Sequence, residues 1–191
     1  MGINSVTKAA LVVAALGLGS QASAANLVTN GSFETGDFTG WTQVGNTGAT
    51  GVSTAAYWGV SVPDGAYIAY FGAVDSLGGI SQNIATVAGD NYNVSFDLYN
   101  FGGTPSEYQV QFGGNTLTDV VNPGSFGWTA FSFVETAASN STVLTFQFQQ
   151  NPSYFLLDNV QITTATPIPA AVWMVGSALF GVFGFARKKT A

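Results

Sequence analysis

Apolar and polar residues alternate one by one over several short stretches of this chain. In residues 92–99 every second side chain is aromatic or aliphatic, and residues 108–112 and 144–149 repeat the pattern. Successive side chains of a strand point to opposite faces of a sheet, so the alternation indicates strands with one face in a core and the other in solvent. Strands of this kind are typical of antiparallel sheets. The alternation therefore predicts an all-β fold.

Further strands are expected where short runs rich in β-branched and aromatic residues lie between turn residues. These runs cover residues 41–44, 66–71, 79–84, 117–121, 129–134 and 155–162. Turn-forming sequences such as Gly113-Gly114-Asn115 and Asn122-Pro123-Gly124 separate them. About eight to ten short strands with turn signals between them favour an antiparallel β-sandwich, in particular a jelly roll.

The first residues have the pattern of a secretory signal peptide. Lys8 is the only charged side chain before the apolar run 9–19, and Ala22 and Ala24 are the small residues of a cleavage site. The run is too short to be a stop-transfer segment. We therefore expect a signal peptide over residues 1–25, with cleavage after Ala24 or Ala25, and an exported protein.

The last residues have the pattern of a membrane-spanning helix. The seventeen residues 170–186 are uncharged and largely apolar, and Arg187-Lys188-Lys189 follows them. At 1.5 Å per residue such a helix is roughly 26 Å long, close to the thickness of a hydrocarbon core. The basic cluster places its end in the cytoplasm and the preceding chain outside. A buried C-terminal helix is the alternative, but an all-round apolar helix that ends in three charges fits a soluble core poorly.

This C-terminal segment resembles a known sorting signal. From Pro167 it reads Pro-x-Pro-Ala-Ala-x-Trp, followed by the apolar run and the basic cluster. That order resembles the PEP-CTERM signal, especially its variant Val-Pro-Leu-Pro-Ala, although Thr166 replaces the Val and Ile168 stands where the main pattern has Glu. The resemblance implies tethering in the inner membrane of a Gram-negative bacterium. It also implies cleavage near Pro167, Ile168, Pro169 and Ala170 by an exosortase-like membrane protease, and delivery to the cell surface or extracellular matrix.

Basic and acidic residues lie in different parts of the chain. The four basic residues all lie in the two terminal segments, whereas the ten carboxylates all lie between Glu34 and Asp158. The predicted domain, residues 26–163, therefore has a formal charge of −10 and no cation, before a sorting segment over residues 164–191. Because it cannot neutralise phosphates, nucleic-acid binding is excluded, and anionic lipid surfaces are disfavoured. The chain also lacks Cys and His, so disulfides, the usual zinc ligands and the common catalytic triads are excluded, and its oxygen ligands suit calcium.

Motifs at both ends of the predicted domain resemble those of one family of binding modules. Asn30-Gly31-Ser32-Phe33-Glu34 and then Gly40-Trp41 stand near its beginning, and Leu157-Asp158-Asn159-Val160 near its end. They resemble the landmarks of galactose-binding-like jelly-roll carbohydrate-binding modules. The resemblance implies that Glu34 and Asp158 share a structural calcium ion, with Ser32 and nearby carbonyls completing its ligands. Hard cations need several oxygens, and such a site would join the first strand to the last. Alternatively, Glu34 lies in a turn and Asp158 is a solvated residue at a strand end.

Aromatic and amide side chains are the groups expected to bind a sugar. A ring packs on the C–H face of a pyranose, while amides and carboxylates hydrogen-bond its hydroxyls. Tyr57 and Trp58 are adjacent, and in an extended segment they would point to opposite faces. The polar positions of the predicted strands carry Tyr99 and several acids or amides, which are Asp97, Gln109, Gln111, Gln147 and Gln149. These residues would form one amide-rich face if their strands are neighbours. Alternatively, the glutamines only solvate the surface; Trp41 and Trp128 are assigned to the core.

No arrangement of acids predicts catalysis. A glycosidase needs two carboxylates at a set separation, and Glu34, Glu107 and Glu135 are the only glutamates. The sequence therefore favours an exported, non-catalytic β-sandwich that binds polysaccharide or has a structural role in a matrix. An adhesin-like module that binds proteins is the alternative, and a hydrolase is a third and weaker one.

Overall fold

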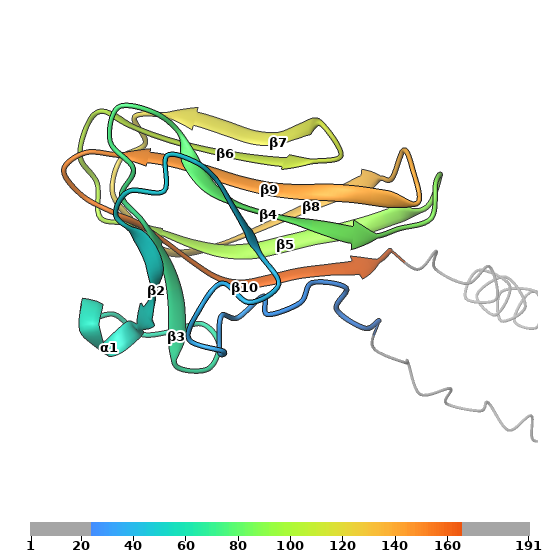
Figure 1. Cartoon of the computed structure of the whole chain (residues 1–191), viewed down its shortest axis with the longest axis horizontal. Helices are drawn as coiled ribbons and strands as arrows, with labels where there is room; N and C mark the ends of the chain where they lie inside the picture. The colour runs from blue at the N-terminus through green and yellow to red at the C-terminus, as the bar shows by residue number, and fades with distance from the viewer. Residues whose placement is uncertain (1–23, 166–191) are drawn as a thin grey trace, which may run out of the picture.

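The computed structural model describes residues 24–165, which form two antiparallel sheets packed face to face (Figure 1). The first sheet has the strand order β1-β4-β9-β6-β7 and the second the order β2-β3-β10-β5-β8. The elements are β1 (Thr42–Gly45), β2 (Thr50–Thr54), α1 (Ala55–Trp58), β3 (Tyr67–Phe71), β4 (Gly78–Ala85), β5 (Asn91–Asn100), β6 (Ser106–Phe112), β7 (Asn115–Val121), β8 (Phe126–Thr136), β9 (Ser141–Gln150) and β10 (Phe155–Thr164). The prediction of an all-β antiparallel sandwich is confirmed.

Most of the two predicted terminal segments lies outside the described residues. The signal-cleavage residue Ala22 and the sorting residues Pro167, Ile168, Pro169 and Ala170 are among those not described, whereas Ala24 is the first described residue. Within residues 24–165 no helix has the length and apolar character needed to cross a membrane. The signal peptide and the membrane-spanning helix therefore stay predictions.

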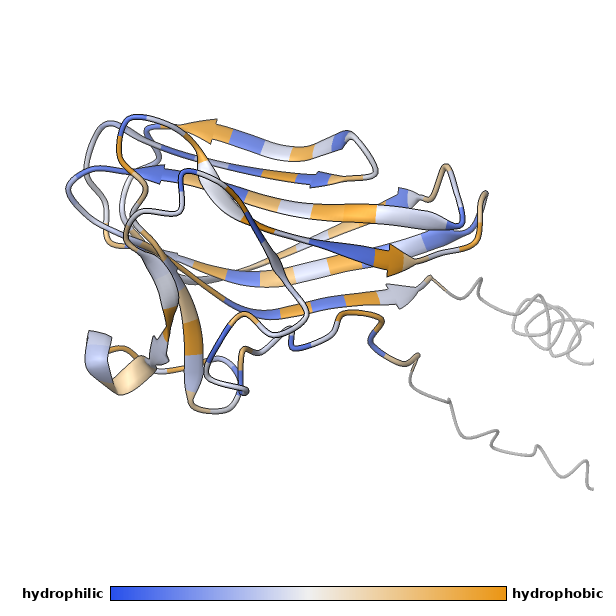
Figure 2. Ribbon diagram, viewed as in Figure 1, coloured by the Kyte–Doolittle hydropathy of each residue, from blue (hydrophilic) through white to orange (hydrophobic). Residues whose placement is uncertain are grey.

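The alternating residues form the core between the sheets. In β5, Val94, Phe96 and Leu98 are buried, and Phe146 and Phe148 of β9 are buried opposite them. Phe96 meets Phe146 edge-on with ring centroids 5.0 Å apart. Figure 2 shows the resulting alternation of hydrophobic and hydrophilic residues along the strands. Because this core lies entirely within residues 24–165, that part of the chain has what it needs to fold alone.

The two motifs from opposite ends of the domain lie against each other. The segment before β1 runs beside the end of β10, where the Leu27 amide donates to the Ile162 carbonyl oxygen at 2.8 Å and the Val160 amide donates to that of Gly31 at 2.9 Å. A Cβ on Gly31 would lie 2.1 Å from the Val160 carbonyl oxygen, so only glycine fits there. Trp41 is buried, as predicted.

A second, smaller apolar cluster covers the outer face of the second sheet. Ala55, Ile68 and Leu156 are buried there, beneath α1 and residues 59–66. The expectation that Tyr57 and Trp58 belong to an extended segment is wrong, because both lie in α1. Ala55 and Ala56 favour a helical turn, and Gly59 ends it in the left-handed conformation, with φ 67°.

This cluster lies far from the point where the chain leaves the domain. The strand β5 begins at Asn91, whose carbonyl oxygen accepts the Ala165 amide, and it ends at Asn100, opposite Phe155. Ten residues of strand span about 30 Å. In Figure 1 the C-terminal end of the coloured ribbon accordingly lies on the right, whereas α1 lies on the left.

Candidate functional site

Seven aromatic side chains gather on the outer face of the second sheet and beside it. We call this group the aromatic surface; it consists of Tyr57, Trp58, Tyr70, Tyr99, Phe101, Trp128 and Tyr154. The sheet register brings the strand residues together, because Leu156 of β10 pairs with Tyr70 of β3 on one side and with Tyr99 of β5 on the other. Neighbouring strands lie about 4.8 Å apart, so the two tyrosines flank the leucine at about 10 Å from each other.

Trp58 is the centre of the aromatic surface. Its ring centroid lies 4.8 Å from that of Tyr154, 5.3 Å from that of Tyr70 and 5.9 Å from that of Phe101. Its indole N–H donates to Ser53 Oγ at 2.7 Å, which fixes the orientation of the ring. Next to it, Tyr57 is 78% exposed. Trp58 therefore holds the group together, while Tyr57 presents a ring to solvent.

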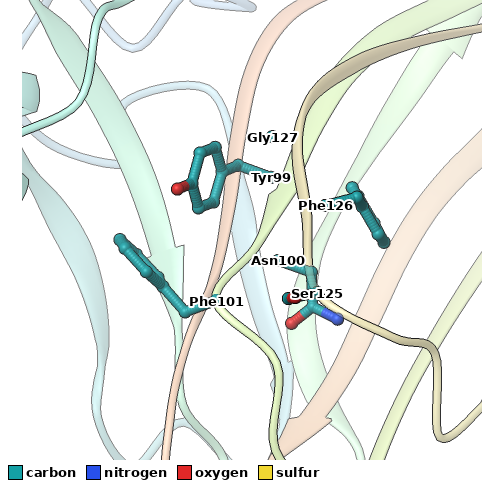
Figure 3. Close-up of a pocket in the computed structure, with 6 residues that line it drawn as sticks. All are labelled: Tyr99, Asn100, Phe101, Ser125, Phe126 and Gly127. Carbon is teal, nitrogen blue, oxygen red and sulfur yellow. The ribbon is translucent and has the colours of Figure 1, made fainter.

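Two hollows lie along this surface. One, of about 210 Å³, is lined by Ser53, Tyr57, Trp58, Tyr70 and Tyr154. The other, of about 320 Å³, is lined by Tyr99, Asn100, Phe101, Ser125, Phe126 and Gly127. Figure 3 shows the rings of Tyr99 and Phe101 on one side of the strands and that of Phe126 on the other. The ring of Phe101, which lines one hollow, packs beside that of Trp58, which lines the other.

Buried amides support the second hollow. Gln150 Nε2 donates to Asn100 Oδ1 at 2.8 Å and to the Gly102 carbonyl oxygen at 3.0 Å. Asn100 Oδ1 also accepts the Gly102 amide at 2.9 Å. These bonds fix the turn that carries Phe101. Gln150 Oε1 is buried and has no hydrogen-bond partner among the described residues.

The segment 59–66 is held against the sheet at several points. The indole N–H of Trp128 donates to the Ser61 carbonyl oxygen at 2.5 Å, and the Asp64 amide donates to Asp158 Oδ2 at 3.1 Å. Glu34 Oε1 accepts the amides of Ala66 and Tyr67 at 2.7 and 2.8 Å. Two carboxylates and one indole therefore set the shape of the segment beside the aromatic surface.

The structure divides the residues predicted to bind sugar between two faces. Tyr57, Trp58 and Tyr99 belong to the aromatic surface, but Gln109 and Gln111 lie on β6 of the first sheet. Gln109 Nε2 donates there to Asp119 Oδ2 of β7 at 2.9 Å. A single amide-rich face that includes Tyr99 is therefore not formed, because β5 is in one sheet while β6 and β9 are in the other.

Four members of the aromatic surface are not among the residues that the sequence predicts to bind sugar. They are Tyr70, Phe101, Tyr154 and Trp128, and the sequence predicts that Trp128 belongs to the core. Trp128 is half-buried at the smaller outer cluster and does not belong to the core between the sheets. The sequence holds a signal for two of these residues, because Phe101 and Tyr154 lie at the turn sequences Phe101-Gly102-Gly103 and Asn151-Pro152.

Asp158 is fully buried, so the alternative of a solvated residue at a strand end is wrong. Its Oδ1 accepts the Asn159 amide at 2.7 Å, in addition to the bond from Asp64 to Oδ2. Burial raises the pKa of Asp158 to about 7; the two amide hydrogen bonds oppose this rise, and the charges of Asp64 and Asp97 add to it.

Glu34 and Ser32 are the other two residues predicted to bind the metal ion. Glu34 accepts the amides of Ala66 and Tyr67 with the same oxygen, Oε1. Its carboxyl group also lies close to Gly65, where a Cβ would be 2.2 Å from the carboxyl carbon. Ser32 is half-buried between the buried residues Gly31 and Phe33. Within residues 24–165 there is no group of three or more acidic side chains that could share a metal ion.

The fold is similar to those of solved carbohydrate-binding modules. The module TmCBM61, in complex with beta-1,4-galactotriose, matches with a TM-score of 0.61 and 20% identity over 73% of this chain and 99% of that module. The CBM22-1–GH10 modules of endo-1,4-beta-D-xylanase 10B from Clostridium thermocellum, complexed with xylohexaose, match with a TM-score of 0.53 and 19% identity over 74% of this chain and 29% of that protein. The C-terminal family 22 module of the same xylanase matches with a TM-score of 0.52 and 16% identity over 72% of this chain and 92% of that module.

At these identities the similarity is one of fold. The chain has the two-sheet sandwich of non-catalytic carbohydrate-binding modules, some of which are domains of enzymes. No family model matches the sequence, and no curated protein matches it either.

Proposed function

We propose that this domain is a non-catalytic module that binds polysaccharide through the aromatic surface. The observation that carries the proposal is the gathering of seven rings at one end of the sandwich, where they line two hollows. Rings pack on the C–H faces of pyranoses, and hydroxyl groups such as those of Ser53 and Ser125, which line the two hollows, suit sugar hydroxyls. The similarity of fold to modules solved with galactotriose and xylohexaose supports the same proposal.

Affinity electrophoresis of the chain ending at Ala165 tests this function. We expect its migration to be retarded in gels that contain a suitable neutral polysaccharide, such as a galactan, a xylan or the exopolysaccharide of the source bacterium. Aromatic side chains are also enriched at protein interfaces. Unchanged migration with every polysaccharide, together with capture of a surface protein, would favour the adhesin-like alternative.

We also propose that Glu34 and Asp158 hold a structural calcium ion. Asp158 is fully buried, and residues 24–165 contain no Lys, Arg or His that could neutralise it. A divalent cation would supply that charge, with Ser32 and nearby backbone carbonyls as further oxygen ligands. Both carboxylates already contact residues 64–67, so an ion there would strengthen the junction between the two ends of the domain.

Replacing Glu34 by Gln separates a calcium ligand from a purely structural residue. Gln retains an oxygen that accepts the Ala66 and Tyr67 amides but loses the charge. At 100-fold excess over its dissociation constant, calcium should stabilise the native chain by about 2.7 kcal/mol, and E34Q should lose most of this gain. The measurement is the melting temperature with calcium and with a chelator, and E107Q is the matched control. A native midpoint that is the same in both conditions would contradict the proposal.

We propose further that the C-terminal segment directs the exported protein to an exosortase-like protease and on to the cell surface or matrix. The aromatic surface lies about 30 Å from Ala165, so ligand binding is compatible with a tether at that end.

Replacing Pro167 and Pro169 by Ala should block this release. The double variant should stay in the membrane fraction at full mass, whereas the native protein should appear outside the cell without its basic end. The variant P123A, changed in a turn of the domain, should be released normally. Equal release from a strain that lacks exosortase would show that another route is used.

A further inference from the structure

The surroundings of the aromatic surface are acidic, with no compensating cation. Residues 24–165 contain ten carboxylates and no Lys, Arg or His. Two of the acids flank the aromatic surface. Asp97 lies two residues before Tyr99 on the same strand, and therefore on the same face of the second sheet. Asp64 is exposed on the segment whose Ser61 carbonyl oxygen accepts the Trp128 indole N–H.

Within the described part of the chain, nothing else would attract an anion to this surface. Anion sites in proteins are built from Arg and Lys side chains or from the N-terminal amides of helices. The helix beside the aromatic surface, α1, has four residues, and the amides of Asp64, Ala66 and Tyr67 already donate to carboxylates. Among residues 24–165, an anionic sugar placed on the rings would thus meet only negatively charged side chains.

We infer that the aromatic surface favours uncharged polysaccharides over those that carry a carboxylate or sulfate on each repeat; this rests on the polysaccharide-binding function proposed above. Each acidic repeat of a bound chain would be repelled by the flanking acids. At low salt this repulsion is weakly screened, because the Debye length then exceeds the distance between the bound repeat and the acids. An uncharged sugar on the rings would not be repelled by these acids.

Matched polymers that differ only in charge test this inference. Polygalacturonate and alginate are compared with their carboxyl-reduced forms, in sodium buffer without added calcium, against the chain ending at Ala165. At about 20 mM salt we expect each acidic polymer to bind at least about tenfold more weakly than its reduced form, and at about 500 mM salt we expect the difference to shrink. A neutral galactan and a neutral xylan are included as uncharged references.

Neutralising the flanking acids identifies the residues responsible. D64N combined with D97N should reduce the preference for the uncharged polymer severalfold, because the local charge is removed while side-chain shape is kept. D119N, on the outer face of the first sheet, should leave the preference unchanged. Asp97 accepts a hydrogen bond from Asn159, so melting temperatures confirm that the variants are folded.

The outcomes are distinct. Equal or tighter binding of the acidic member of either pair would overturn the inference and leave the polysaccharide-binding function standing. Failure of every polymer, charged or neutral, to bind would overturn both.

Discussion

Replacing Trp58 by Ala is expected to reduce polysaccharide affinity by at least about 2 kcal/mol, or roughly 30-fold, the cost typical of a central aromatic residue at a binding site. The ring of Trp58 contacts those of Tyr57, Tyr70, Phe101 and Tyr154, and it lines one of the two hollows. Its removal would both delete a stacking ring and loosen its neighbours. Isothermal titration with a bound polysaccharide measures the loss.

A second variant separates binding from folding. Trp58 is half-buried and its removal also costs packing, whereas Tyr57 is 78% exposed. The substitution Y57A should therefore leave the melting temperature unchanged and weaken binding by about 0.5–1.5 kcal/mol. As a matched control, V143A removes another exposed apolar side chain, on the first sheet, and should bind normally. Native affinity in Y57A and W58A together would place the sugar elsewhere.

The two faces of the sandwich can be compared directly. Gln109 and Gln111 lie on the first sheet, away from the aromatic surface on the second. Their combined replacement by Ala should leave affinity unchanged if the sugar binds at the rings. Loss of binding in this double variant would instead assign the site to the amide face.

The sequence alone predicts the sandwich well because its strands carry local signals. The alternation in residues 92–99 corresponds to β5, whose apolar side chains are buried as expected. In this strand a pattern within a few residues determines the outcome. The Asn30-Gly31 motif contacts Val160 through the backbone, whereas the calcium ion predicted to join the two ends of the domain stays a prediction.

The remainder depends on contacts between distant residues. The strand β2 contains Gly51 and lacks a strong alternation, but it pairs with β3, where a Cβ on Gly51 would lie 2.4 Å from the Tyr70 hydroxyl oxygen. The division of Tyr99 and Gln109 between sheets follows from the strand order, which alternation along one strand does not encode. Asp158 is buried because the segment 59–66 folds over it, a contact across 94 residues.

Burial of Asp158 gives the domain a distinctive dependence on pH. Its pKa is raised from 3.8 to about 7, mainly by burial, so between these values the folded chain keeps a proton that the unfolded chain has released. In chelator, the stability contributed by this residue is therefore fully present below pH 4 and is lost as the pH rises toward 7, by up to about 4 kcal/mol. Asp37 does not contribute to this fall in stability, because hydrogen bonds from Thr39 and Thr35 lower its pKa and its effect on stability lies at lower pH.

Calcium should remove this dependence, because the ion binds the ionised carboxylate and competes with the proton, so that folded and unfolded chains then hold the same number of protons on Asp158 between pH 4 and pH 7. Unfolding free energy, measured by urea denaturation in saturating calcium, should therefore be nearly constant across this window. The substitution D158N keeps one acceptor oxygen but cannot ionise, so its own stability should not show the fall in chelator. D119N removes an exposed charge and should behave like the native protein in both conditions. If native protein and D158N have the same slopes in chelator, the raised pKa of Asp158 is refuted; if calcium leaves the native slope unchanged, the ion does not bind this carboxylate.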